Sequence, residues 1–228
     1  MNSQEIKDQI CDVCHKMWQL GWVAANDGNV SVKMEDGTYW ITPSGISKSF
    51  ITPDKLLRVD AAMNVVEGPE NYKPSSEMKM HMRCYELRDD VGAVVHAHPP
   101  AATGFAVAHL PMDRYIMIEA VISLGSVPLT PFGVPSTKEV PDAIAPYLPD
   151  HDAMLLENHG AVTVGADLCT AYYRMETLEL WAKIELNARL LGGEKEISEK
   201  NIGRLLELRK SAKVTGRHPG YRHYRKNK

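Results

Sequence analysis

The sequence predicts an α/β protein in which helices and a sheet pack together in layers. Two long segments, residues 3–21 and 167–191, carry apolar side chains at helical spacing. Between them lie short apolar segments bounded by glycine, proline or polar turn residues, as strands are. Because helical and strand-like segments alternate along the chain, a layered α/β fold is the class they favour. With 228 residues, 44% of them hydrophobic, we expect one domain spanning residues 1–228.

The first half of the chain is expected to begin with a helix and a β-hairpin. Ser3 can cap the first helix and Gly21 can end it. A typical Asp-Gly hairpin turn joins the strands expected at residues 29–33 and 39–42. The elements expected next are a strand at 56–59, a helix from Pro74 to about Leu87, a strand at 93–97 and a short helix at 101–109.

The second half continues this alternation and ends in a basic tail. The strands expected here are at 127–130, 153–157 and 161–164, and the helices are at 137–147, 167–191 and 198–210. From about residue 210 onward, lysine and arginine are frequent and no apolar period continues. We expect this tail to be solvated or to cover the active site.

The overall composition disfavours several classes of protein. The formal net charge of -3 gives the whole chain no attraction to nucleic acid or to an anionic membrane. No apolar run is long enough to span a membrane, which takes about 18 residues or more. The N-terminus also lacks the basic start of a secretory signal. A cytoplasmic protein with reduced cysteines is therefore the expectation.

One motif points to a function that the rest of the sequence contradicts. Cys11-Asp12-Val13-Cys14-His15 matches the pattern of covalent haem attachment. That attachment requires export to an oxidising compartment, for which the sequence has no visible signal. The two cysteines are also neighbours on the expected first helix. We therefore interpret Cys11 and Cys14 as buried thiols.

Two histidines form the strongest candidate for chemistry. His96 and His98 occupy alternate positions at the end of an apolar strand, so their side chains project from the same face. Paired neutral imidazoles suit a divalent metal ion such as zinc. A catalytic zinc needs a third protein ligand. The residues leave two candidates for it, His159 in an Asn-His-Gly turn and Glu77 at the first turn of a helix.

Three loops carry small, hydroxyl or amide residues that suit an anion such as phosphate. These loops are residues 27–29, residues 42–45 and the pair Ser75-Ser76. The serine pair lies at the expected N-terminus of a helix, where unpaired backbone N–H groups favour negative charge. Ordinary turns and N-caps use the same residues, so each loop alone also fits a purely structural role.

Five short motifs occur in an order and spacing that resemble the class II aldolase/adducin family. The motifs are Gly28-Asn29-Val30-Ser31, Ile41-Thr42-Pro43-Ser44-Gly45, Pro74-Ser75-Ser76-Glu77, Val95-His96-Ala97-His98 and Asn158-His159-Gly160. The match runs from about residue 20 to residue 192. The resemblance implies a three-layer α/β/α domain with a mainly antiparallel central sheet. It also implies a homotetramer whose active sites lie between neighbouring subunits.

The resemblance further implies a role for each motif residue. His96, His98 and His159 match the three histidine ligands of one zinc ion. Glu77 matches a fourth ligand, a carboxylate that then leaves the zinc to act as acid/base. The residues that match the family's phosphate-binding positions are Gly28, Asn29, Ser44, Gly45, Ser75 and Ser76.

The group that handles the proton of the substrate's C4 hydroxyl has more than one match. In aldolases of this family, a tyrosine from the adjacent subunit serves that role. Tyr115 matches it when residues are counted forward from Pro111. Met117 matches it when they are counted back from the next strand, and Tyr221 or Tyr224 of the tail are further candidates.

The implied activity is the cleavage of a phosphorylated ketose. We expect a zinc-dependent aldolase that splits L-fuculose 1-phosphate, or a similar deoxyketose 1-phosphate, into dihydroxyacetone phosphate and an aldehyde. A decarboxylase of a 3-oxo acid phosphate and a sugar-phosphate 4-epimerase remain open as alternatives on the same scaffold. Glu77 favours the aldolase, because the epimerases resemble Pro-Ser-Ser-Asp at this motif. An adducin-like interaction module is disfavoured, because adducin head domains lack the metal residues.

Overall fold

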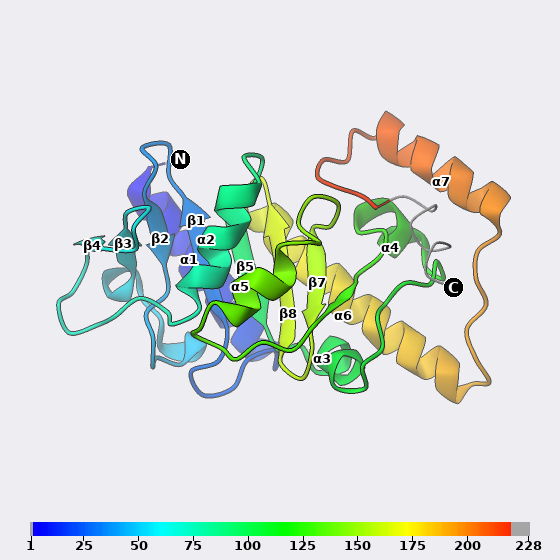
Figure 1. Ribbon diagram of the computed structural model, residues 1–228, viewed down its shortest axis with the longest axis horizontal. Helices are drawn as coiled ribbons and strands as arrows, with labels where there is room; N and C mark the ends of the chain where they lie inside the picture. Colours follow the sequence, from blue (N-terminus) through cyan, green and yellow to red (C-terminus); the bar gives the residue numbers. More distant parts are fainter. Residues whose placement is uncertain (1, 220–228) are drawn as a thin grey trace.

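The computed structural model describes residues 2–219, in which helices cover both faces of a central sheet (Figure 1). The α-helices are α1 (Ser3–Gln19), α2 (Met78–Leu87), α3 (Pro100–Val107), α4 (Ile118–Ser123), α5 (Glu139–Ile144), α6 (Leu168–Leu190) and α7 (Glu199–Ser211). The strands are β1 (Asn29–Lys33), β2 (Tyr39–Ile41), β3 (Leu57–Val59), β4 (Val65–Glu67), β5 (Ala93–Ala97), β6 (Leu129–Thr130), β7 (Ala153–Leu156) and β8 (Gly160–Gly165). Two short 3-10 helices are η1 (Lys48–Phe50) and η2 (Pro53–Lys55).

The sheet has eight strands in the order β4-β3-β2-β1-β5-β8-β7-β6. Its neighbouring strands run antiparallel except for the edge pair of β6 and β7, which is parallel. In the centre, β5 pairs with β1 on one side and with β8 on the other. The predicted α/β fold with a mainly antiparallel sheet is therefore confirmed.

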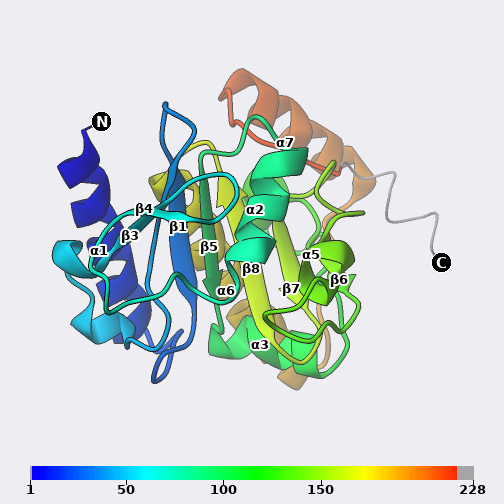
Figure 2. The same cartoon turned by 60° about the vertical axis from the view of Figure 1, so that its left-hand side comes forward.

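The two faces of the sheet are covered by different helices, which makes three layers (Figure 2). On one face, α1, α3 and α6 bury side chains such as Met17 and Trp181 against Val95 of β5. On the other face, α2 and α5 bury Met80 and Ile144 against a second set of strand residues, which includes Val94. Because successive strand residues point to opposite faces, His96 lies on the same face as Val94, beneath α2.

Besides the two 3-10 helices, one strand and one α-helix were not expected from the sequence. β4 lies at the edge of the sheet and all three of its residues are exposed, so it lacks the alternation of a half-buried strand. α4 has only six residues, and its buried residues Ala120 and Val121 face other helices. The predicted start of α2 at Pro74 was also wrong. Pro74 forms an isolated β-bridge with Pro43, and the helix begins at Met78.

The cysteines of the haem-like motif are buried in α1, as predicted. Burial raises the pKa of both Cys11 and Cys14 to about 12, so both thiols stay protonated and unreactive. The ring of the adjacent His15 lies 2.9 Å from the backbone oxygen of Ile51, measured from Nε2. These residues pack α1 against the chain that follows β2.

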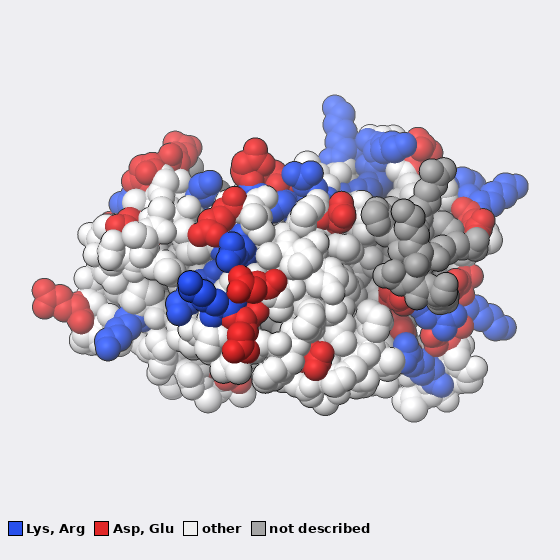
Figure 3. All heavy atoms as spheres, viewed as in Figure 1, with Lys and Arg blue, Asp and Glu red and all other residues white. Residues whose placement is uncertain are grey.

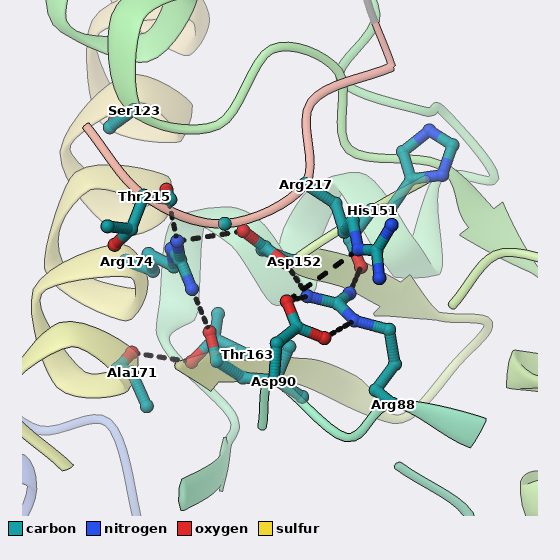
Figure 4. Close-up of polar contacts among 12 residues, drawn as sticks. Arg88, Asp90, Ser123, His151, Asp152, Thr163, Ala171, Arg174, Thr215 and Arg217 are labelled. Atoms are coloured by element: carbon teal, nitrogen blue, oxygen red, sulfur yellow. Dashed lines mark hydrogen bonds and ion pairs between the residues drawn. The ribbon is translucent and has the colours of Figure 1, made fainter. Parts of the chain in front are cut away.

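A buried ionic cluster holds the C-terminal segment against the sheet (Figure 4). The Asp152 carboxylate is buried between the guanidinium groups of Arg88, at 2.7 Å, and Arg174, at 2.8 Å. Arg174 also donates to the backbone oxygen of Thr215 across 3.0 Å. Arg209 of α7 donates to the same oxygen across 3.0 Å. The chain that follows α7 is thereby fixed at residue 215, while Tyr221 and Tyr224 lie outside the described residues.

None of the helices that the structure describes has the length and apolar composition needed to cross a membrane.

The charges on one face of the molecule agree with the near-balance of charge in the sequence. Lysine, arginine, aspartate and glutamate are mixed over α2 and α5 (Figure 3). Arg83, for example, lies 3.1 Å from Asp142. Opposite charges therefore neutralise one another on this face.

Candidate active site

Three histidines meet where β5 ends and β8 begins. His96 is the fourth residue of β5, His98 follows that strand, and His159 immediately precedes β8. Antiparallel pairing of β5 with β8 places the end of one beside the start of the other. The three ring centroids are 4.7, 5.0 and 5.1 Å apart, and one nitrogen of each ring lies within 4.8 Å of the others. The sequence prediction that these three side chains converge is consistent with this geometry.

The turn between β7 and β8 is shaped so that His159 can reach the other two. Asn158 has a φ of 55°, a left-handed conformation that asparagine tolerates better than most residues. Its side-chain oxygen lies 2.7 Å from His109 Nε2, which supports that conformation. Gly160 lets the turn pack closely, because a Cβ there would lie 2.5 Å from His98 Cδ2. The local backbone thus favours asparagine at 158 and glycine at 160, on either side of His159.

Glu77 completes the group from the opposite side. It is the N-cap residue of α2, whose side chain makes no capping hydrogen bond and turns toward the histidines. Its Oε2 lies 3.2 Å from His96 Nε2, and its Oε1 lies 3.4 Å from His159 Nε2. Both candidates for the third ligand that the sequence left open therefore lie at the same point.

These donor atoms have the spacing of ligands around one tetrahedral metal ion. Zn–N and Zn–O distances near 2.1 Å place the ligand atoms about 3.4 Å from one another. His96 Nε2 lies 3.2 Å from His98 Nε2, and the two Glu77 distances are similar. His96 Nδ1 lies 2.9 Å from the backbone oxygen of Ala161, which fixes the tautomer with a free lone pair on Nε2. The residues therefore fit a zinc-type ion.

The electrostatic environment shifts the pKa values of all four groups, and not all in the same direction. Burial raises the pKa of the Glu77 carboxyl, but the nearby His96 and His159 and the Asn29 amide outweigh burial and hold it well below its usual range. Burial, reinforced by repulsion from His96, lowers the pKa of His98 to about 3 and that of His159 to about 4. The pKa of His96 is raised, because Glu77 outweighs the effect of its burial.

A polar pocket joins this group to the loops that the sequence marked as anion-binding. Among the residues that line the pocket are Glu77, His98 and His159. Its other lining residues are Asn26, Asp27, Gly28, Asn29, Pro43, Ser44, Gly45, Ser75, Ser76 and Pro135. All six residues predicted to bind phosphate thus share one cavity wall with three of the four predicted metal ligands. Asn26 and Pro135 were not predicted.

The serine pair lies in the pocket, although not at the N-terminus of a helix as the sequence suggested. The backbone N–H of Ser75 donates to the oxygen of Thr42 across 3.2 Å, so it is not available for an anion. The Ser75 hydroxyl accepts from the N–H of Glu77 at 3.3 Å. Ser76 is exposed to the pocket. An anion at this position would therefore be bound mainly by side chains and by the remaining loops.

Lys48 is a buried lysine beside two of these loops, and it was not predicted from the sequence. Its side chain is 1% exposed, and Nζ donates to the backbone oxygens of Asn26, at 3.3 Å, and Ile46, at 3.1 Å. Burial lowers the pKa of Lys48, while Cys14, Asp27 and Glu77 act in the opposite direction. The lysine thereby links the residue before the 27–29 loop to the residue after the 42–45 loop.

Tyr115 lies apart from the pocket of its own chain. It is buried with Val121 of α4 and Ile202 of α7. Its backbone oxygen accepts a hydrogen bond from Ile197 across 2.8 Å, and its ring centroid is 6.5 Å from that of His218. Tyr115 is 3% exposed, so a catalytic role in the pocket of a neighbouring copy would require its side chain to turn out of this contact.

Comparison with known proteins identifies the family. A family model described as "Class II Aldolase and Adducin N-terminal domain" matches residues 8–186. The chain belongs to this family. The L-fuculose phosphate aldolase of Escherichia coli O6:H1 is 32% identical over 186 residues, which cover 82% of this chain and 85% of the relative. The chain therefore falls among the aldolases of the class II aldolase and adducin family.

Solved structures give the same result. A structure of an L-fuculose 1-phosphate aldolase superposes with a TM-score of 0.84 and 29% identity, covering 92% of this chain and 98% of that chain. The L-fuculose-1-phosphate aldolase of Thermus thermophilus superposes with a TM-score of 0.72 and 34% identity, covering 82% of this chain and 95% of that chain. The predicted resemblance to fuculose phosphate aldolases is confirmed.

Proposed function

We propose that this class II aldolase uses a divalent metal ion, zinc, to cleave a ketose 1-phosphate into dihydroxyacetone phosphate and an aldehyde. The observation that carries the proposal is the single polar pocket lined by Glu77, His98 and His159 together with the six anion-loop residues. A phosphate in the loops would hold the ketose with its reacting carbons beside the histidines. L-Fuculose 1-phosphate or a similar deoxyketose phosphate is the proposed substrate, in line with the names of the relatives.

Each group in the pocket has a definite task in this proposal. His96, His98 and His159 would hold the metal ion, with Glu77 as the fourth ligand. When bound there, zinc supplies a Lewis acid that polarises the ketose carbonyl and stabilises the charge left by C3–C4 cleavage. Glu77 is ionised and lines the pocket, so it would exchange a proton at C3 once it moves away from the imidazoles that lower its pKa. Asn29, Ser44 and Ser75 would bind the phosphate.

The proton of the C4 hydroxyl needs a second group. We assign it to Tyr115 of an adjacent copy, because the family resemblance implies a tyrosine from a neighbouring subunit and Tyr115 lies away from the pocket of its own chain. This assignment requires a homo-oligomer, which we propose to be a tetramer with active sites between subunits. Phenylalanine substitution of Tyr115, Tyr221 and Tyr224, each measured by the rate of ketose 1-phosphate cleavage, compares these candidates; Met117, which the alternative count places here, has no proton to transfer.

Two other activities use the same machinery. A decarboxylase of a 3-oxo acid phosphate needs the same stabilised enolate, so the four metal-binding groups do not distinguish it. A 4-epimerase is disfavoured, because its motif carries aspartate where this chain has Glu77. Incubation of zinc-loaded protein with dihydroxyacetone phosphate and a panel of aldehydes would separate the three. New ketose phosphates should accumulate if the protein is an aldolase, and none should form if it is only a decarboxylase or an epimerase.

A further inference from the structure

A chain of buried polar side chains runs from the pocket into the core between β1 and α2. Asn29 and Ser31 alternate on β1, so they share the face that packs against α2. His81 and Tyr85 follow Glu77 at intervals of four residues and share one side of α2. The side chains of Asn29, Ser31, His81 and Tyr85 are all buried. Ser31 and His81 are 0% exposed. The surrounding residues of this layer are apolar.

The five side chains are linked by consecutive hydrogen bonds. Asn29 Nδ2 donates to Glu77 Oε2 across 2.9 Å, and Asn29 Oδ1 lies 2.5 Å from His81 Nε2. His81 Nδ1 lies 2.6 Å from the hydroxyl of Ser31. That hydroxyl lies 2.7 Å from the hydroxyl of Tyr85. No link exceeds the normal hydrogen-bond range.

When Glu77 is ionised and His81 is neutral, only one arrangement of protons satisfies every link. An ionised carboxylate only accepts, so the Asn29 amide must present its NH₂ group to Glu77 and its oxygen to His81. His81 must then carry its proton on Nε2 and accept at Nδ1. Ser31 donates to that nitrogen and in turn accepts from Tyr85. Burial also lowers the pKa of His81 to about 3, so the ring is neutral and has a single proton to place.

We propose that His81 is a positioning residue that fixes the side-chain amide of Asn29 with its NH₂ group facing the pocket. One N–H of that amide holds Glu77, and the second remains for an anion in the pocket that Asn29 lines. If the amide were turned around, its oxygen would face both the carboxylate and the anion and would repel them. His81 thereby makes this wall of the pocket a donor surface. The part of the inference that concerns phosphate rests on the proposed function.

Two substitutions at His81 and one control test this role. His81→Gln keeps one donor and one acceptor, whereas His81→Leu removes both. Tyr85→Phe is the matched control, since Ser31 can still donate to His81 without the phenol. Zinc-loaded protein is titrated with inorganic phosphate by calorimetry. We expect His81→Leu to weaken phosphate binding by about 10- to 100-fold, because the Asn29 amide can then turn and lose its hydrogen bond to the charged phosphate. His81→Gln and Tyr85→Phe should weaken it by less than about 5-fold, because the amide stays fixed.

Nuclear magnetic resonance tests the same inference without any ligand. In the wild type, the side-chain NH₂ signals of Asn29 should be shifted and protected from exchange, and His81 should be the neutral Nε2–H tautomer. His81→Leu should abolish the protection, and His81→Gln should retain it. A wild-type Nδ1–H tautomer, or unchanged Asn29 signals in His81→Leu, would overturn the inference even if a variant folds poorly. Failure of the wild type to bind phosphate would instead contradict the proposed phosphate site.

Discussion

Glu77 Oε1 lies 3.4 Å from His159 Nε2, although the two residues come from the start of α2 and from the β7–β8 turn. The second oxygen of the same carboxylate lies 3.2 Å from His96 Nε2. Each oxygen therefore faces a different imidazole, as expected for a carboxylate that shares a metal ion with both. This carboxylate would be within reach both of a metal ion held by the histidines and of a substrate in the pocket that Glu77 lines. This relationship is the basis for the first two predictions.

The metal site can be tested by substituting His159, a proposed ligand, and Asp27, which lies beside the proposed ligand His98. Purified protein should contain about one zinc or similar divalent ion per chain, by elemental analysis. Asp27 lies 3.6 Å from His98 Nδ1, so Asp27→Asn should weaken zinc affinity by about 10- to 100-fold in a competition assay with a chelator. His159→Ala should weaken it more, because it removes a ligand. Equal affinity in both variants and the wild type would contradict the site.

Glu77→Gln separates the acid/base role from metal binding. If Glu77 exchanges the C3 proton, the zinc-saturated variant should lose roughly 10²- to 10⁴-fold in rate, and excess zinc should not restore it. Exchange of one C3 proton of dihydroxyacetone phosphate with deuterated water, followed by nuclear magnetic resonance, isolates this step. Tyr115→Phe is the control, because it should keep the exchange and lose cleavage. Normal exchange in zinc-loaded Glu77→Gln would leave Glu77 a ligand only.

Ser75→Asp tests the phosphate assignment. The new carboxylate would lie in the pocket wall opposite the substrate phosphate, so KM for a ketose 1-phosphate should rise strongly. Ser75→Ala serves as the size control and should change KM much less. The kcat for an unphosphorylated ketose should be unaffected by the added charge. If phosphorylated and unphosphorylated ketoses are turned over equally well by the wild type, the assignment is wrong.

His81 should make the fold acid-sensitive. Its pKa is lowered from 6.5 to about 3 in the folded protein, mainly by burial. Between these two pH values His81 binds a proton in the unfolded chain but not in the folded chain. Its contribution to stability is fully present above pH 6.5 and is lost as the pH falls toward 3. At pH 5 the loss should be about 2 kcal/mol. Denaturant unfolding of metal-free protein between about pH 8 and pH 4.5 measures it, and His81→Gln should have the shallower slope. Parallel curves for the two proteins would contradict this prediction.

Gly216→Ala should disrupt the anchor of the C-terminal segment. A Cβ at residue 216 would overlap Arg174 Nη2 and the Asp152 carboxylate, and the backbone φ is 90°. Gly192→Ala is the matched control, because its φ of 107° is also unfavourable but no atom lies within 4 Å. The control should cost about 1–2 kcal/mol in the free energy of unfolding, and Gly216→Ala clearly more. Similar losses in both variants would show that only backbone strain matters.

The elements that the sequence predicted well are those with a strong local pattern. α1 and α6 have long amphipathic or buried stretches, and β5 is a continuous apolar segment. β4 could not be predicted, because an exposed edge strand is formed by pairing with a partner rather than by its own pattern. The start of α2 was misplaced because Ser75 is held by a bridge to residues far away in the chain.

The residues of the site likewise differ in whether a local sequence pattern reveals them. The histidine pair of β5 was visible from alternation alone, whereas the choice of His159 as their partner depended on family resemblance. Lys48 was missed, because nothing local distinguishes a buried lysine from a solvated one. The chain through His81 did carry a signal, the interval of four residues from Glu77 to His81 and again to Tyr85, but its meaning depended on the strand that faces it.

The pairing of β5 with β8 also bears on when the metal-binding group can assemble during folding. His96 and Ala161, which are joined by a hydrogen bond at this junction, are 65 positions apart in the chain. Contacts of such long range form late, since a large loop must close first. In the unfolded chain Glu77 and His159 are far from the His96–His98 pair, so the complete set of ligands is absent and the ion should not accelerate folding. It should instead slow unfolding, because it binds the native state after the central strands have paired.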